Sequence, residues 1–132
     1  MPNLHWALRQ GRPCVDVVLT LAVGGQPLVR SLLADTGAGS QFSVFELILD
    51  EDDCLLCGGK PDQPIALGGA YSGFFPTYLL PVTIPGVGFA QILRIVGVPS
   101  VPAGLDGITC FRFLNRFHYG NFGNRSVFGL ES

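Results

Sequence analysis

A long stretch without charged side chains limits what this chain can fold into. Residues 63–93 contain no Asp, Glu, Lys or Arg, and such a length alone would suit a membrane helix. The stretch is interrupted by helix-breaking residues, which are Pro64, Pro76, Pro81, Pro85, Gly68, Gly69, Gly73, Gly86 and Gly88. Proline and glycine at this density do not allow a continuous helix. The sequence therefore predicts buried β-structure with turns, and no membrane span.

The composition describes one small domain with few charges. The chain has 132 residues, which suits one domain with its own core, so we assign residues 1–132 to a single domain. It is 48% hydrophobic and 14% charged, with a net charge of −2. This balance gives no electrostatic basis for nucleic-acid binding, and it predicts apolar surface buried against a partner. Residues 1–6 lack a basic-then-apolar signal pattern, so a cytoplasmic location is expected.

Two predicted strands lie before residue 35. In residues 13–23 large apolar residues recur at every second position, namely Val15, Val17, Leu19 and Leu21. This alternation is typical of a half-buried strand. Residues 24–27, Gly-Gly-Gln-Pro, predict a turn. Residues 28–34 are then a second strand, so the two form a hairpin that ends at Asp35.

The rest of the chain is predicted to be mostly strand. Residues 42–49 suit either a short helix capped by Ser40 or a strand, and residues 50–64 suit a solvated acidic loop. Further strands are expected over residues 65–67, 77–84, 89–96 and 126–130. Residues 68–75 form a long hairpin tip rich in glycine and aromatic residues. A helix over residues 111–117, capped by Thr109 and ended by His118 and Gly120, completes an all-β fold with one short C-terminal helix.

The four cysteines give a weak metal signal. Cys54 and Cys57 have the spacing of half a zinc site, but a second pair at similar spacing is missing. Cys14 and Cys110 stand alone, and the simplest interpretation is four reduced thiols in a loop and in the core. We therefore expect no metal and no cofactor. A zinc or thiol-redox protein that uses Cys54 and Cys57 is a distant third hypothesis.

An acidic turn follows the second strand. In Leu32-Leu33-Ala34-Asp35-Thr36-Gly37-Ala38 an apolar run ends in a carboxylate, a hydroxyl and a glycine. Such a sequence is often only a turn, since Asp and Gly favour turns. A carboxylate placed there can also act on water if a second carboxylate meets it. The chain has no second copy of the motif, and three other sets of acids are poorer candidates for the second carboxylate. These are Asp16 on the polar face of a strand, Asp106 in a predicted turn, and the solvated run Asp50, Asp52 and Asp53.

This motif and its surroundings resemble the retropepsin-like aspartic proteases. A hairpin precedes the motif, and the glycine-rich residues 68–75 follow it like that family's flap hairpin. Residues 105–110 resemble the family's later element of two apolar residues and a glycine, with residues 111–117 as the helix behind it. Here Thr109 replaces an apolar residue, Cys110 replaces the glycine, and Gly39 stands where retroviral members commonly have an acid. The resemblance covers residues 13–130 and implies a small closed barrel-like acid protease fold.

The resemblance also implies roles for individual residues. Asp35 would be catalytic, and Thr36, Gly37 and Ala38 would support its loop, with Thr36 bonding across to its counterpart. The flap and substrate-binding residues would be Gly69, Ala70, Tyr71, Ser72 and Gly73. A peptide or protein substrate would lie extended beneath them. The second carboxylate would come from a twofold homodimer, whose interface strands would be residues 4–8 and 127–130.

Paired carboxylates suit peptide hydrolysis for an electrostatic reason. Like charges held close cannot both ionise, so one group acts as base and the other as acid at the same pH. The sequence therefore predicts an aspartic endopeptidase that hydrolyses peptide bonds through a water activated by the paired Asp35 carboxylates of a homodimer. The alternative is a non-catalytic peptide-binding or interaction module of the same fold, and the departures at Thr109 and Cys110 motivate it.

Overall fold

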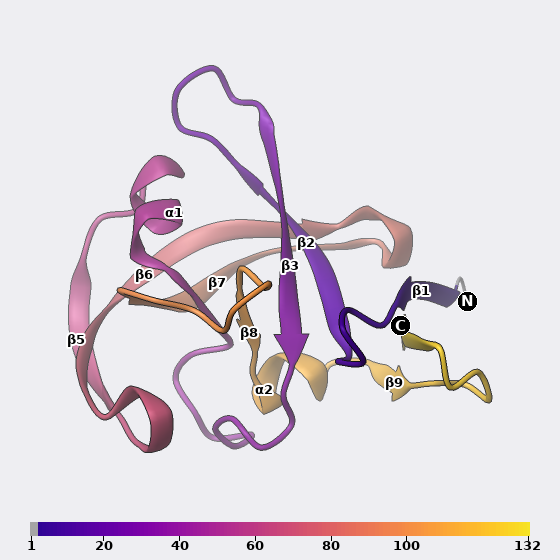
Figure 1. Cartoon of the computed structure of the whole chain (residues 1–132). Helices are drawn as coiled ribbons and strands as arrows, with labels where there is room; N and C mark the ends of the chain where they lie inside the picture. Colours follow the sequence, from indigo (N-terminus) through magenta and orange to yellow (C-terminus); the bar gives the residue numbers. More distant parts are fainter. Residues whose placement is uncertain (1–2) are drawn as a thin grey trace.

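The computed structural model describes residues 3–132, and it is built almost entirely from strands (Figure 1). The strands are β1 (Asn3–Ala7), β2 (Cys14–Thr20), β3 (Pro27–Ala34), β4 (Leu47–Asp50), β5 (Asp62–Leu67), β6 (Gly73–Ile84), β7 (Phe89–Val98), β8 (Gly107–Thr109), β9 (His118–Gly120) and β10 (Val127–Glu131). The helices are α1 (Glu51–Leu56) and α2 (Phe111–Leu114), with 3₁₀ turns η1 (Gly69–Tyr71) and η2 (Pro85–Val87).

Six of the strands close into a barrel. The larger sheet has the order β2-β3-β8-β4-β7-β6-β5, and Val18 of β2 also pairs with Thr83 of β6. This last pairing closes the six strands from β2 to β6 into a ring, and β5 pairs with β6 outside that ring. Neighbouring strands are mostly antiparallel, but β8 lies parallel to β3, and β4 lies parallel to β7. The predicted small closed all-β barrel is confirmed.

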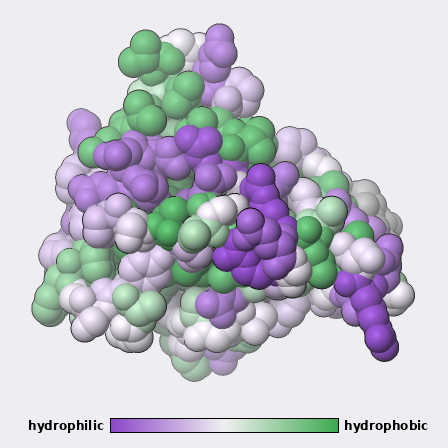
Figure 2. Space-filling view, viewed as in Figure 1, coloured by the Kyte–Doolittle hydropathy of each residue, from purple (hydrophilic) through white to green (hydrophobic). Residues whose placement is uncertain are grey.

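The barrel is filled by the apolar residues that the alternation predicted. Val15, Val17 and Leu19 of β2 are fully buried, whereas Thr20 is exposed. They pack in one cluster with Leu32 of β3 and Phe113 of α2. Burying a large aliphatic side chain is worth about 1.5–3 kcal/mol, so this cluster supplies much of the driving force for closure. Beyond the barrel, the β2–β3 hairpin projects at the top of Figure 1, and Figure 2 shows apolar surface at its tip, where Val23 is exposed.

The two ends of the chain meet in a small second sheet with the order β1-β10-β9. β1 pairs antiparallel with β10 from Leu4↔Leu130 to Ala7↔Val127. Leu130 is fully buried, and Leu4 packs against the barrel core. The strands expected at a subunit interface therefore pair with each other within the chain, and β1 and β9 form the two edges of this sheet.

The acidic loop predicted over residues 50–64 is wrong at its start, where the chain forms α1. The side chain of Asp50 caps this helix by accepting a hydrogen bond from the backbone N–H of Asp52 at 2.9 Å. Glu51, Asp52 and Asp53 occupy the first turn, where the helix dipole favours negative charge. The run of acids is thus an N-terminal helix signal, and residues 57–61 form the connection to β5.

Two further expectations differ from the structure. Residues 42–46 are irregular, so neither a helix nor a strand runs from residue 42 to 49, and only the end of this range lies in β4. The C-terminal helix is confirmed but shorter than predicted. Its N-cap is Cys110, because Thr109 belongs to β8. His118 and Gly120 do not end the helix, because they form β9 against β10. Within residues 3–132, no helix is both long and apolar enough to cross a membrane.

Candidate active site

Asp35 lies at the carboxyl end of β3, where a parallel neighbour holds the chain. β3 pairs with β8 from Leu32↔Gly107 to Ala34↔Thr109, and the backbone N–H of Asp35 donates to the carbonyl of Thr109 at 3.1 Å. Ligands and catalytic groups commonly gather where strands end and irregular loops begin. The ladder therefore fixes the point at which the Asp35 side chain leaves the sheet.

The turn after Asp35 is closed by its own side chain. Oδ1 of Asp35 accepts a hydrogen bond from the backbone N–H of Gly37 at 2.9 Å, and the carbonyl of Asp35 accepts from the N–H of Ala38 at 3.2 Å. Asp commonly stabilises turns in this way. One carboxylate oxygen is thus used to shape the loop, and Thr36 beside it is exposed, with no hydrogen bond to its hydroxyl among residues 3–132.

Thr109 and Cys110 are buried beneath this turn. The Thr109 hydroxyl is satisfied because it donates to the carbonyl of Leu33 at 3.1 Å, which ties β8 to β3 once more. Burial raises the pKa of the Cys110 thiol to about 12, and the charges of Asp35 and Glu46 add to the effect. The thiol is therefore neutral near pH 7. Both side chains fit their surroundings, Thr109 through its hydrogen bond and Cys110 through burial in an apolar cluster.

The backbones of β4 and β8 approach each other closely beneath the Asp35 turn. A Cβ added to Gly107 in β8 would lie 2.2 Å from the carbonyl oxygen of Ile48 in β4 and 3.1 Å from Leu32. No larger residue fits without moving a strand. Glycine at this position lets β4 and β3 pack closely on either side of β8, beneath the Asp35 turn.

Asp35 opens into a cavity of about 550 Å³. Its lining is mostly apolar or glycine and consists of Asp35, Gly37, Ala38, Gly39, Ser43, Phe45, Ile48, Ala66, Leu67, Gly68, Gly69, Ala70, Tyr71 and Ile108. This volume is within the range of sites that bind small molecules or peptide side chains. A single carboxylate in an apolar hollow suits a group that acts on water or a carbonyl while apolar walls hold the substrate.

The tip of the β5–β6 hairpin lines one side of the cavity. Residues 68–71 line it together with the Asp35 turn, and η1 lies within this tip. The ring of Tyr71 meets Phe75 edge to face, with centroids 6.3 Å apart, and packs against the cluster that contains Cys110. Burial raises the pKa of Tyr71, with a smaller contribution from Cys110. The tip therefore forms one side of the cavity, and Tyr71 packs against the apolar cluster at its floor.

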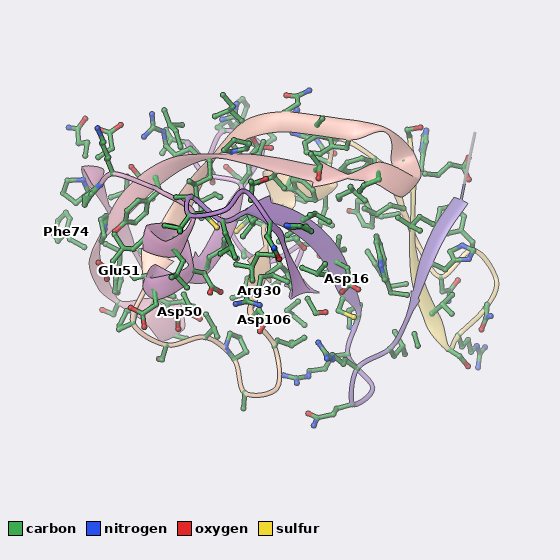
Figure 3. The ribbon with its side chains drawn as sticks, turned by 90° about the horizontal axis from the view of Figure 1, so that it is seen from above. Asp16, Arg30, Asp50, Glu51, Phe74 and Asp106 are labelled. Atoms are coloured by element: carbon green, nitrogen blue, oxygen red, sulfur yellow. The ribbon has the colours of Figure 1, made fainter. Side chains whose placement is uncertain are left out.

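Other acids of the described chain lie away from this cavity. Arg30, Asp50 and Asp106 share a separate hollow (Figure 3), and Arg30 forms an ion pair with Asp53 at 2.7 Å. Asp16 accepts a hydrogen bond from the hydroxyl of Ser31. Among residues 3–132, Asp35 is the only carboxylate that lines the cavity. One chain thus provides one carboxylate.

The structure brings most of the predicted site residues together. Of the predicted set, Asp35, Gly37, Ala38, Gly69, Ala70 and Tyr71 line the cavity. Thr36 points to solvent instead, and Ser72 and Gly73 lie beyond the lining, where β6 begins.

Sequence reasoning missed the opposite wall, which is formed by Gly39, Ser43, Phe45 and Ile48. One sequence signal for this wall was present, namely the glycine at position 39 directly after the Asp35–Ala38 motif. Gly39 has a φ of +74°, and a Cβ there would lie 2.7 Å from Oγ of Ser43. Glycine therefore suits this position because of its backbone conformation and the close approach of Ser43.

The Cys54–Cys57 pair lies on α1 and its C-cap, apart from the cavity. Both thiols are free, and burial raises the pKa of each, in the case of Cys54 to about 12. Among residues 3–132, no group of three His, Cys, Asp or Glu side chains is arranged to hold a metal ion. Protonated thiols are poor metal ligands and poor nucleophiles.

Comparison with known proteins leaves the chemistry of the site as the main guide to function. No protein-family model matches the chain, and no curated protein or solved structure matches it significantly.

Proposed function

We propose that this chain is an aspartic endopeptidase of the retropepsin type that works as a twofold homodimer. The observation that carries the proposal is the position of Asp35, at the end of β3, in a mostly apolar cavity that holds no other carboxylate of the described chain. A twofold axis that passes near Asp35 would supply the missing group from a second copy. The exposed hydroxyl of Thr36 would then be available to bond to its counterpart.

In this proposal the two Asp35 carboxylates share one proton. The ionised group accepts a proton from a water molecule, which attacks the peptide carbonyl, while the protonated group donates to the carbonyl oxygen. The titration belongs to the pair and not to either residue. The glycine-rich tip over residues 68–72 would open to admit an extended peptide and close to exclude water. The four free thiols support a reducing, cytoplasmic location.

The proposal is tested with Asp35→Asn, which keeps the size of the side chain but cannot act as a base. Cleavage of a pool of fluorogenic peptides should fall to background, while the far-ultraviolet circular dichroism and the sedimentation coefficient stay unchanged. Asp52→Asn is the matched control, because Asp52 is an exposed acid outside the cavity. Undiminished cleavage by the Asp35→Asn variant would refute the proposal.

A non-catalytic peptide-binding module is the second candidate. The observation that favours it is that one chain alone forms the apolar cavity, including the hairpin tip that lines it. Such a module needs no second carboxylate, so it would remain monomeric at high concentration and bind peptides without cleaving them. Sedimentation of the wild-type chain across a hundredfold range of concentration, roughly from 1 to 100 μM to span common dimer affinities, separates the two candidates.

A further inference from the structure

The cavity wall opposite the hairpin tip is an irregular loop, residues 39–45, here called the wall loop. It supplies Gly39, Ser43 and Phe45 to the cavity. Backbone hydrogen bonds hold the residues on either side of it, because Ala38 accepts from Phe111 at 2.9 Å and Glu46 accepts from Cys110 at 3.0 Å. The loop therefore spans between two fixed points at the start of α2.

Within the wall loop the hydrogen bonds are internal. The N–H of Ser43 donates to the carbonyl of Ser40 at 3.1 Å, and the N–H of Ser40 donates to Oγ of Ser43 at 2.9 Å. Oγ of Ser40 accepts from the N–H of Phe42 at 3.2 Å. These bonds make the loop one compact turn, but they do not determine where the turn lies relative to the barrel.

One apolar contact and one hydrogen bond do. Phe45, at the end of the wall loop, packs against the cluster that contains Ile48 and Cys110. Nη1 of Arg112 donates to the carbonyl oxygen of Ser43, and among residues 3–132 no other hydrogen bond joins the wall loop to the rest of the molecule. Arg112 lies on the exposed side of α2, whose Phe113 and Leu114 are buried in the barrel. A charged donor forms a stronger hydrogen bond than a neutral one. The loop is therefore attached to the helix, and through the helix to the core.

We propose that Arg112 is a positioning residue that fixes the wall of the substrate cavity. It does not line the cavity, and it acts through the carbonyl of Ser43 on the residues that do. Loss of the bond loosens residues 39–43, so Ser43 no longer presents a set surface to the substrate, while Phe45 still packs against the apolar cluster. Binding weakens, while the Asp35 turn, which has its own hydrogen bonds, keeps its geometry. The consequence for substrate rests on the proposed peptidase function; the consequence for loop order does not.

The test compares Arg112→Met, Arg112→Lys and the control Arg125→Met in the full chain. Arg125 also lies on the surface, and no hydrogen bond joins it to the wall loop among the described residues. In Arg112→Met we expect the amides of Ser40, Phe42 and Ser43 to exchange hydrogen about tenfold faster, the factor that corresponds to losing one such bond. The lysine variant, which keeps a donor, should lie between, and the control should match wild type.

Activity provides the second measurement, with the fluorogenic peptide that the wild type cleaves best. In Arg112→Met, KM should rise about tenfold while kcat stays within about twofold, since binding and not the chemical step loses support. Unchanged exchange in the wall loop, or faster exchange without a rise in KM, would overturn the proposal. If wild type cleaves no peptide, the peptidase function fails, and the exchange rates alone still decide whether Arg112 positions the loop.

Discussion

Replacing Arg116 with methionine removes one half of an ion pair next to the cavity wall. The guanidinium binds Glu46 with two hydrogen bonds, of which Nη2 to Oε2 measures 2.8 Å, and it lies over the ring of Phe89 at 5.7 Å. The side chain of Glu46 is only 7% exposed, against 32% for Arg116. The substitution therefore leaves a carboxylate that is nearly buried and has lost its counter-ion.

The cost follows from this difference in exposure. Removing one partner of a fully buried pair costs about 3–5 kcal/mol. Because a third of Arg116 is exposed, water can partly replace it, so we expect about 3 kcal/mol. Set against a total stability of about 5–15 kcal/mol, this is a large fraction. For a chain of this length it corresponds to a fall in Tm of about 10–15 °C.

Urea unfolding monitored by fluorescence measures the effect. Trp6 is the only tryptophan, and it packs against the barrel core, so its emission reports on global unfolding. Glu46→Gln, Arg116→Met and the double variant form a cycle, and the coupling energy should be about 2 kcal/mol because the neutral amide does not need the guanidinium. A loss below about 1 kcal/mol in Arg116→Met, or additive single effects, would refute the argument that Glu46 depends on this partner.

Two other predictions concern the floor of the cavity. Gly107→Ala should lower the free energy of unfolding by about 3 kcal/mol or more, because its Cβ would collide with the carbonyl of Ile48. Thermal unfolding measures this loss. A loss under about 1 kcal/mol would show that β4 and β8 can move apart at little cost in free energy. The pKa values of Cys54 and Cys110 rise from 9.0 to about 12 in the folded state, so the unfolded chain releases these protons first. The stability that these two protonated thiols contribute should be fully present below pH 9 and be lost between pH 9 and about 12. In Cys110→Ala the free energy of unfolding should fall less steeply over this range. An unchanged slope in that variant would contradict the raised pKa of Cys110.

The elements that sequence reasoning predicted well are those that depend on local pattern. The alternation in β2 and the turn after it need only neighbouring residues, and so does the placement of Asp35 after a strand. α1 was missed because its acids were counted as solvated charge, although Asp50 and the acids that follow it carry a capping signal.

The cavity wall could not be predicted in the same way. The place of Ser43 depends on Arg112, which lies 69 residues further along the chain. The partner of Glu46 is 70 residues away. No local pattern in residues 39–46 indicates either contact. The hairpin tip could therefore be predicted as one side of the cavity, but the wall loop could not be predicted as the other.

The parallel pairing of β3 with β8 has a consequence for the order of folding. On the β8 side, the end of β3 is held by Thr109, whose hydroxyl reaches back 76 residues to the carbonyl of Leu33. Closing so long a loop costs conformational entropy before the contact contributes any stabilising free energy. During synthesis the β2–β3 hairpin can form early, yet Asp35 acquires its support only after residue 109 has emerged. The nascent chain therefore carries its acidic turn for most of its elongation without a site around it.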